Sequence, residues 1–197
     1  NDYFRGNGYY AKALDKMDLP EADRYYLEIQ GANSSADVYL NGKHLAHHDG
    51  GYSTWRVDIT ETLERENLFA IVVNNEANEI VYPQMADFTF YGGLYRDVNI
   101  ICVNESHFDL EYYGSNGVKI TPEVVEKDAK VEILTTVTNK KEGQTIRYTI
   151  YAADGEEVAK VETAETKAVL DIADVHLWHG RKDPYLYRAC VELMEGE

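Results

Sequence analysis

The densest group of residues that could do chemistry in this chain is the stretch 87–98, with the sequence DFTFYGGLYRDV. It places one carboxylate, Asp87, among the aromatic rings of Phe88, Phe90 and Tyr91. A carboxylate accepts hydrogen bonds from hydroxyl groups, and aromatic faces cover the apolar side of a ring-shaped ligand. The stretch therefore indicates a sugar-binding site. The adjacent glycines that follow allow a sharp turn or the close approach of another group.

The elements that must position this stretch are predicted to be short strands. Tyr, Val, Ile and Thr are abundant, and these residue types favour strands. The dipeptides Asn41–Gly42 and Asp154–Gly155 predict tight hairpin turns. The continuous apolar run 68–73 predicts a strand buried on both faces, and the run from Leu94 predicts another strand. The clearest helix candidate is a single turn at 59–63, capped by a neighbouring Asp or Thr.

These segments predict an all-β chain of two sandwiches. In the first half, short strands separated by turns are typical of an antiparallel sandwich. From about residue 105, six or seven evenly spaced strands indicate an immunoglobulin-like sandwich, although no Cys-Trp-Cys arrangement of the antibody type is present. We predict domains at 1–104 and 105–197.

Composition narrows the classes of partner. The 197 residues carry 19 Lys and Arg against 35 Asp and Glu, a formal charge of −16. This balance argues against a nucleic-acid partner, because phosphate binding needs clustered positive charge. No apolar run approaches membrane-spanning length, so no membrane partner is expected and a soluble protein with a neutral ligand fits best. The two cysteines, Cys102 and Cys190, are interpreted as buried free thiols, which leaves the compartment open between bacterial cytoplasm and periplasm.

A second group of candidate ligands follows the Asn41–Gly42 turn. His44, His47, His48 and Asp49 are residue types that bind zinc. Their place just beyond a hairpin favours a solvated loop instead, and we predict no metal site in this chain.

Several segments together resemble the N-terminal part of family 2 glycoside hydrolases. The segments 36–43 (ADVYLNGK), 50–52 (GGY) and 57–60 (VDIT) resemble the sugar-binding domain of that family, and 92–98 (GGLYRDV) resembles its last strand. Trp178 followed by 184–187 (PYLY) resembles the end of the next, immunoglobulin-like domain. The matches run in the expected order over almost the whole chain. The resemblance implies a jelly-roll, galactose-binding-like sandwich followed by an immunoglobulin-like one.

The same resemblance implies what this chain would do. The family's catalytic residues lie in a third domain, a (β/α)₈ barrel of about 250 residues that is absent here. The chain is therefore expected to be the non-catalytic front end of a retaining β-glycosidase, most closely a β-galactosidase, with its own barrel and a β-linked carbohydrate as partners. No cofactor is expected here, and a monovalent or divalent cation belongs to the parent enzyme. The alternatives are a β-glucuronidase or β-mannosidase parent, a free-standing carbohydrate-binding module, and a structural segment that shapes a homo-oligomer.

Within this framework Asp87 is the expected substrate-binding residue. In family members the aspartate ahead of the Gly-Arg-Asp strand reaches the sugar, and in some it also touches a bound monovalent cation. The alternative is a loop aspartate that caps a turn. Asp97 is expected to pair with Arg96 or another neighbour and to be structural. The dipeptides Asn75–Glu76 and Asn104–Glu105 mimic the family's acid/base motif but follow no barrel strand, so we interpret them as loop residues.

Overall fold

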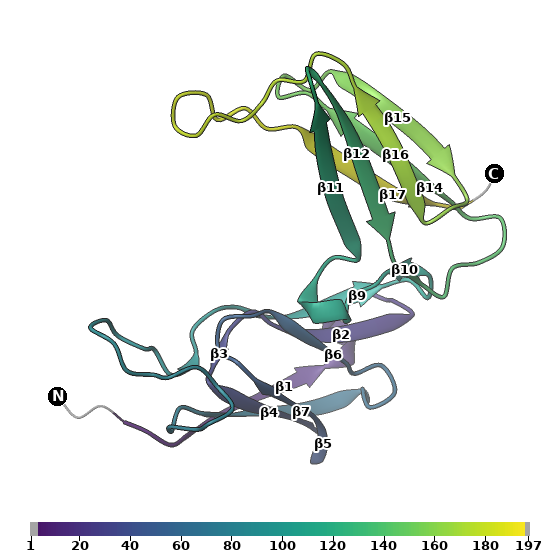
Figure 1. Cartoon of the computed structure of the whole chain (residues 1–197). Helices are drawn as coiled ribbons and strands as arrows, with labels where there is room; N and C mark the ends of the chain where they lie inside the picture. The colour runs from purple at the N-terminus through teal and green to yellow at the C-terminus, as the bar shows by residue number, and fades with distance from the viewer. Residues whose placement is uncertain (1–3, 196–197) are drawn as a thin grey trace. The chain divides into compact units, whose positions relative to one another are not determined.

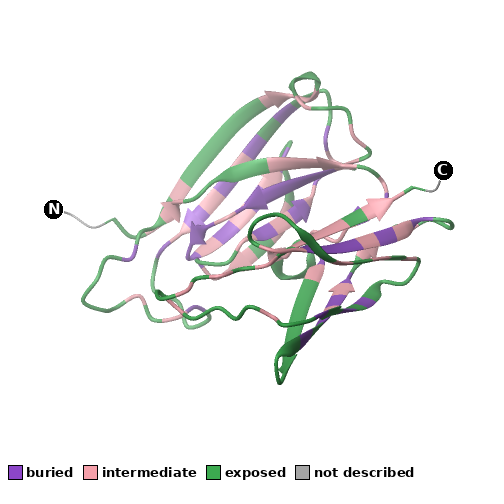
Figure 2. Ribbon diagram, turned by 90° about the horizontal axis from the view of Figure 1, so that it is seen from above, coloured by how far each residue is buried: buried purple, intermediate pink, exposed green. Residues whose placement is uncertain are grey.

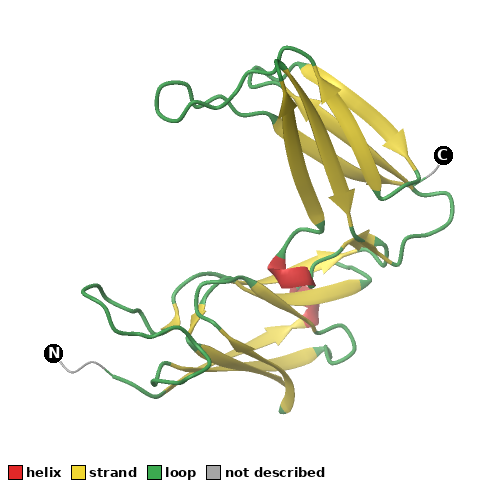
Figure 3. Cartoon of the chain, in the orientation of Figure 1, coloured by secondary structure: helices red, strands yellow, loops and turns green. Residues whose placement is uncertain are grey.

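Alternation of apolar and polar side chains defines the strands, because successive side chains point to opposite faces. In β4 (Ser35–Leu40), Ala36, Val38 and Leu40 are buried while the residues between them remain partly exposed. Figure 2 shows the same alternation along other strands of the computed structural model, which describes residues 4–195. Within that range there is no α-helix, only the 3₁₀ turns η1 (Lys16–Asp18) and η2 (Tyr112–Gly114), as Figure 3 shows. The all-β prediction is confirmed.

Residue contacts divide the chain into two compact units. The first runs to Glu105 and adds Leu110–Ser115, and the second comprises Ser106–Asp109 and the chain from Asn116 onward. Among residues 4–195, no helix is long and apolar enough to cross a membrane.

The first unit is a sandwich of antiparallel sheets (Figure 1). One sheet has the strand order β1-β7-β4-β5, the other has the order β6-β2-β9, and β3 pairs with β8. The bounds not yet given are β1 (Asn7–Asp15), β2 (Arg24–Ile29), β3 (Ala32–Asn33), β5 (Lys43–Asp49), β6 (Trp55–Asp58), β7 (Glu66–Asn74), β8 (Gly93–Leu94) and β9 (Val98–Val103). Between the sheets lies an apolar core in which Ile29, Val38, Leu40 and Ile59 are fully buried.

Two local predictions in this unit are confirmed or refined. Asn41 and Gly42 join β4 to β5 with φ values of 53° and 82°, the left-handed pair of angles that a type I′ hairpin turn requires. The predicted helical turn is present only as a hydrogen-bonded turn, in which Leu63 N–H donates to the Ile59 carbonyl at 2.9 Å. Asp58 caps it by accepting from Thr60 N–H at 2.9 Å.

The prediction that 68–73 is buried on both faces is wrong. Strand β7 alternates, with Phe69, Ile71 and Val73 buried and Leu68 55% exposed. Only one face of the β1-β7-β4-β5 sheet packs on the core, so the other face of this apolar run lies open. A run of apolar residues does not by itself distinguish these cases.

The second unit is also a sandwich, with strand orders β11-β12-β16 and β15-β14-β17 and a short β10-β13 pair. The bounds are β10 (His107–Phe108), β11 (Val118–Val125), β12 (Asp128–Thr135), β13 (Val137–Thr138), β14 (Thr145–Tyr151), β15 (Glu157–Thr163), β16 (Lys167–Ile172) and β17 (Arg188–Met194). Ile133, Ile146 and Tyr148 are fully buried at its centre. The predicted Asp154–Gly155 turn joins β14 to β15, with Gly155 at a φ of 92°.

The cysteines lie in different units, Cys102 in β9 and Cys190 in β17. Both are free, and both are half-buried rather than buried as predicted. Burial raises the pKa of the Cys102 thiol.

Candidate functional site

Asp87 lies in the long loop that joins β7 to β8 in the first unit. Its side chain is exposed, and so are large apolar neighbours in the same loop: Phe88 is 64% exposed, Tyr91 69% and Met85 89%. A carboxylate accepts hydrogen bonds only, while these side chains offer apolar surface. The loop thus presents both kinds of contact that the sequence predicts for a sugar site.

A row of aromatic rings supports this loop from within the unit. Tyr52 stacks on Tyr82 with ring centroids 5.0 Å apart, and Tyr82 stacks on Phe90 at 6.4 Å. Phe90 is only 9% exposed, and its ring lies 4.9 Å from that of Phe88. Contacts of this geometry add to the energy of burying the rings. The row therefore anchors the loop immediately beside Asp87.

The amide of Asn33 is the main polar anchor. Asn33 is 1% exposed; its Nδ2 donates to the Tyr91 carbonyl at 2.7 Å, and its Oδ1 accepts from the Tyr82 hydroxyl at 2.9 Å. Burial raises the pKa of Tyr82 to about 12, so this hydroxyl keeps its proton at neutral pH. A Cβ atom at Gly51 would lie 2.4 Å from Asn33 Oδ1, so the anchor requires glycine there.

A second amide, that of Asn75, anchors the start of the loop. Its Nδ2 donates to the Phe4 carbonyl at 2.9 Å, and its Oδ1 accepts from Gly6 N–H at 2.8 Å. A Cβ at Gly92 would lie 2.5 Å from Asn75 Nδ2, which explains the first glycine of the Gly-Gly pair. Asn75 is 7% exposed and outside the strands, so its role is structural and the loop interpretation of Asn75–Glu76 is confirmed.

The other Asn-Glu dipeptide is also outside the strands and is structural. The Glu105 carboxylate receives two hydrogen bonds at 3.0 Å from the Arg24 guanidinium. Paired planar contacts of this kind fix both side chains.

The second glycine and the basic residue after it hold the end of the loop. Gly93 has a φ of 77°, and a Cβ there would overlap the hydroxyl of Tyr10, which in turn accepts from Leu94 N–H at 3.2 Å. Arg96 Nη1 donates to the Tyr52 carbonyl at 3.0 Å, and its guanidinium lies 5.2 Å from the centroid of the Tyr95 ring.

The expected Arg96–Asp97 ion pair is absent from the described part of the chain. The reason is that Arg96 turns toward Tyr52 and Tyr95, while Asp97 is exposed and contributes its backbone carbonyl to Gln30 N–H at 3.0 Å. Asp97 is therefore not the strand-anchoring side chain that the sequence predicts.

The histidine cluster lies in strand β5, so its interpretation as a solvated loop is wrong for His47, His48 and Asp49. The strand continues because these residues pair with β4 as far as Ser35. Among residues 4–195, no group of three or more His, Cys, Asp or Glu side chains could hold a metal ion.

The sequence carries no motif for Asn33 or Asn75 as anchors. Asn33 acts on a carbonyl 58 residues later, and Asn75 on a glycine 69 residues earlier. The visible signals were the glycines Gly51 and Gly92, whose missing side chains make room for Asn33 and Asn75.

Both units match known protein families. Residues 7–91 match the family described as glycosyl hydrolase 2 galactose-binding domain-like, and residues 116–197 match glycosyl hydrolases family 2. The chain belongs to glycoside hydrolase family 2. It comprises the sugar-binding domain and the immunoglobulin-like domain of that family, which confirms the resemblance drawn from the sequence.

The sequences of individual relatives align with nearly the whole of this chain. A β-glucuronidase of Bacteroides fragilis is 33% identical across 98% of this chain and 30% of its own length. A β-galactosidase of Thermoanaerobacter pseudethanolicus is 25% identical across 97% of this chain and 26% of its own length. The chain thus spans less than a third of the length of these curated relatives.

Among solved structures, an FMN-binding β-glucuronidase from Faecalibacterium prausnitzii L2-6 is 38% identical with a TM-score of 0.91, and the match covers 99% of this chain and 31% of that one. A putative β-galactosidase from Bacteroides fragilis is 32% identical with a TM-score of 0.87, over 98% and 31% of the two chains.

Proposed function

We propose that the whole protein is a retaining β-glycosidase and that its substrates are β-glucuronides. The observation that carries the choice of sugar is the ranking of relatives: proteins named β-glucuronidase reach 33% and 38% identity, against 25% for the β-galactosidase of Thermoanaerobacter pseudethanolicus. This preference replaces the β-galactosidase expectation from the sequence. β-Galactosidase remains the second candidate, because the Bacteroides fragilis structure of that name is 32% identical.

We place the domain bounds at 1–104 and 105–197 and the catalytic barrel elsewhere in the whole protein. A retaining glycosidase needs two carboxylates about 5 Å apart on a rigid support, one as acid/base and one as nucleophile. The Asn-Glu dipeptides of this chain are structural, so this chain supplies no catalytic residue and by itself is inactive. Its partners are the barrel and the β-linked carbohydrate.

Asp87 is the residue of this chain that we assign to the substrate. Its exposed carboxylate accepts a hydrogen bond from a sugar hydroxyl, with Phe88 and Tyr91 beside it. A carboxylate repels the carboxylate of a glucuronide, so Asp87 faces the hydroxyl edge of the sugar rather than its acid group. The anchors at Asn33 and Asn75 hold the loop in place and so reduce the entropy cost of binding.

The test is to assay the whole protein with nitrophenyl β-glucuronide and nitrophenyl β-galactoside. We expect kcat/KM to be higher for the glucuronide by about tenfold or more, since the sugars differ in a charged group. A higher kcat/KM for the galactoside would favour β-galactosidase, the second candidate. No turnover of either substrate would overturn the proposal. The chain 1–197 alone should give only background hydrolysis.

A further inference from the structure

The open face of the β1-β7-β4-β5 sheet carries an unbroken row of polar side chains across its strands. Strand pairing places Asn7 opposite Asn74, Asn74 opposite Ser35, and Ser35 opposite Asp49. Directly opposed residues in a sheet project from the same face. All four strands therefore contribute a hydrogen-bonding group to one line.

The next outward-facing row is mixed in character. It runs from Tyr9 through Val72 and Asp37 to His47, again by direct strand pairing. Tyr9 is 76% exposed, and its hydroxyl lies 3.3 Å from Asn7 Nδ2 in the first row. An apolar patch with an exposed aromatic ring thus borders the carboxylates.

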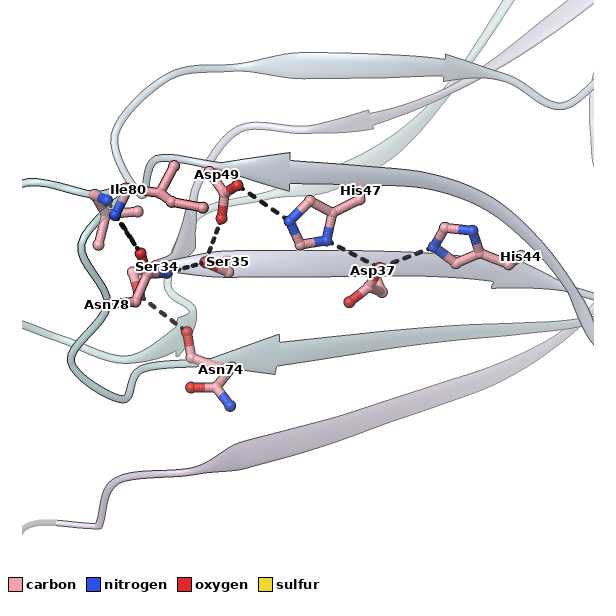
Figure 4. Close-up of polar contacts among 10 residues, drawn as sticks. Ser34, Ser35, Asp37, His44, His47, Asp49, Asn74, Asn78 and Ile80 are labelled. Atoms are coloured by element: carbon pink, nitrogen blue, oxygen red, sulfur yellow. Dashed lines mark hydrogen bonds and ion pairs between the residues drawn. The ribbon is translucent and has the colours of Figure 1, made fainter.

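These rows and the start of the loop after β7 enclose a depression of about 390 Å³. Every member of both rows except Tyr9 lines the depression, together with Glu76, Asn78 and Ile80 from the start of the loop after β7. Asn78 Nδ2 donates to the Ser35 hydroxyl at 3.0 Å, which fixes this wall (Figure 4). The volume falls within the range of small-ligand sites.

His47 lines this depression and lies between two carboxylates. Its Nδ1 lies 3.0 Å from Asp37 Oδ1, and its Nε2 lies 3.2 Å from Asp49 Oδ2 (Figure 4). Carboxylates only accept hydrogen bonds, so each ring nitrogen must carry a proton. The geometry thus selects the imidazolium form of His47.

The surrounding contacts leave acceptor capacity for a ligand. Both His44 and His47 contact the same oxygen of Asp37, Oδ1, at 2.8 and 3.0 Å. The Ser35 hydroxyl donates to Asp49 Oδ1 at 2.5 Å and orients that carboxylate. Asp37 Oδ2 has no hydrogen-bond partner in the described part of the chain, and the Asp37 side chain is 34% exposed.

We propose that this sheet face is a second carbohydrate-binding site, which takes a neutral saccharide. Asp37 and the polar row bind the hydroxyl groups, and Tyr9 packs against the apolar face of a sugar ring. The carboxylates of Asp37, Asp49 and Glu76 outnumber the single imidazolium, so phosphates and uronic acids are disfavoured. The site is separate from Asp87 and does not depend on which glycoside the whole enzyme cleaves.

The test is an NMR titration of the ¹⁵N-labelled chain with lactose, with glucuronic acid and lysine as charged comparison probes. We expect lactose to shift backbone amides of β4, β5 and β7 around Asp37, His47 and Asn74, with a Kd in the millimolar range, typical of a small ligand on an open surface. Asp37→Ala and Tyr9→Ala should each weaken binding by about tenfold or more. Because Tyr9 is exposed, its variant decides the matter should Asp37→Ala fail to fold.

Asp97→Ala and Tyr113→Ala are the matched controls. They remove an exposed carboxylate and an 86% exposed ring elsewhere, and lactose affinity should not change. The proposal is overturned if lactose causes no shifts up to about 50 mM, or shifts confined to the Asp87 loop. Equal or tighter binding of glucuronic acid or lysine overturns the assignment to neutral saccharides.

Discussion

Asn33 donates a hydrogen bond from Nδ2 to the main-chain carbonyl of Tyr91 at 2.7 Å and thereby ties the Asp87 loop to the buried strand β3. The other end of the same amide accepts from Tyr82 at 2.9 Å. One side chain thus restrains the loop at two points. The position of Asp87 therefore depends on a buried residue that is distant in sequence.

Replacing this anchor should destabilise the first unit. Asn33→Ala removes two partly buried hydrogen bonds, to the Tyr91 carbonyl and from the Tyr82 hydroxyl, and a typical intramolecular hydrogen bond contributes about 0.5–1.5 kcal/mol. We expect a lower free energy of unfolding in urea and, in the whole enzyme, a lower kcat/KM through a displaced loop. Asp87→Ala, which removes an exposed side chain, is the stability control. Wild-type stability of Asn33→Ala would show that the loop holds without this anchor.

Asp87→Ala should lower the activity of the whole enzyme without lowering its stability. The fold is retained because the carboxylate is exposed, but a charge-assisted hydrogen bond to substrate is lost, worth about 1.5–3 kcal/mol or roughly ten- to a hundredfold in kcat/KM. Asp97→Ala is the matched control, since Asp97 is also an exposed carboxylate, in the short segment between β8 and β9. Both variants should melt like the wild type. Unchanged kinetics for Asp87→Ala would reduce Asp87 to a turn residue.

A buried ion pair should govern the acid stability of the first unit. Glu28 and Arg56 are each only 10% exposed, with Arg56 Nε and Nη2 both 2.8 Å from Glu28 Oε2. Burial alone would raise the pKa of Glu28, but hydrogen bonds from Gln30, Arg56 and Asn99 outweigh it and lower that pKa.

Because the pKa of Glu28 is lower in the folded state, its stabilising contribution is present above the ordinary pKa of 4.5 and is lost as the pH falls through the folded value. We expect the urea midpoint to fall below about pH 4.5 in the wild type and to depend less on pH in Glu28→Gln. Arg56→Ala should cost about 3 kcal/mol or more at neutral pH, because it leaves Glu28 buried and unpaired. Identical acid profiles for wild type and Glu28→Gln would contradict this account.

The pKa values of two adjacent histidines in β5 should be shifted in opposite directions. The hydrogen bond to Asp37, together with the contact to Asp49, raises the pKa of His47. Burial lowers the pKa of His48, whose ring stacks on Trp55 with centroids 4.8 Å apart. His47 therefore stabilises the fold below its ordinary pKa of 6.5, and this contribution is lost as the pH rises through the raised value.

The measurement is an NMR titration of the histidine ring protons. The groups facing His47 are Asp37 from β4, Asp49 and His44 from β5, and Glu76 from the loop after β7. Asp37→Asn should lower the pKa of His47 and leave that of His48 unchanged. A His47 pKa below that of His48 would contradict the imidazolium geometry.

Features that depend on near neighbours in the chain can be predicted without the structure. The Asn41–Gly42 turn, the β9 strand and the sandwich class follow from local backbone preference and from the alternation of apolar and polar residues. The motifs and their order along the chain were sufficient to predict the family. The open face of 68–73, the direction of Arg96 and the side chains that hold the Asp87 loop depend on the tertiary structure. It also brought Asp37 and His47 together, through strand pairing next to a register shift between Val38 and Tyr39. Pairing register and contacts between distant residues are set by the packing of the whole unit, and no short stretch of sequence encodes them.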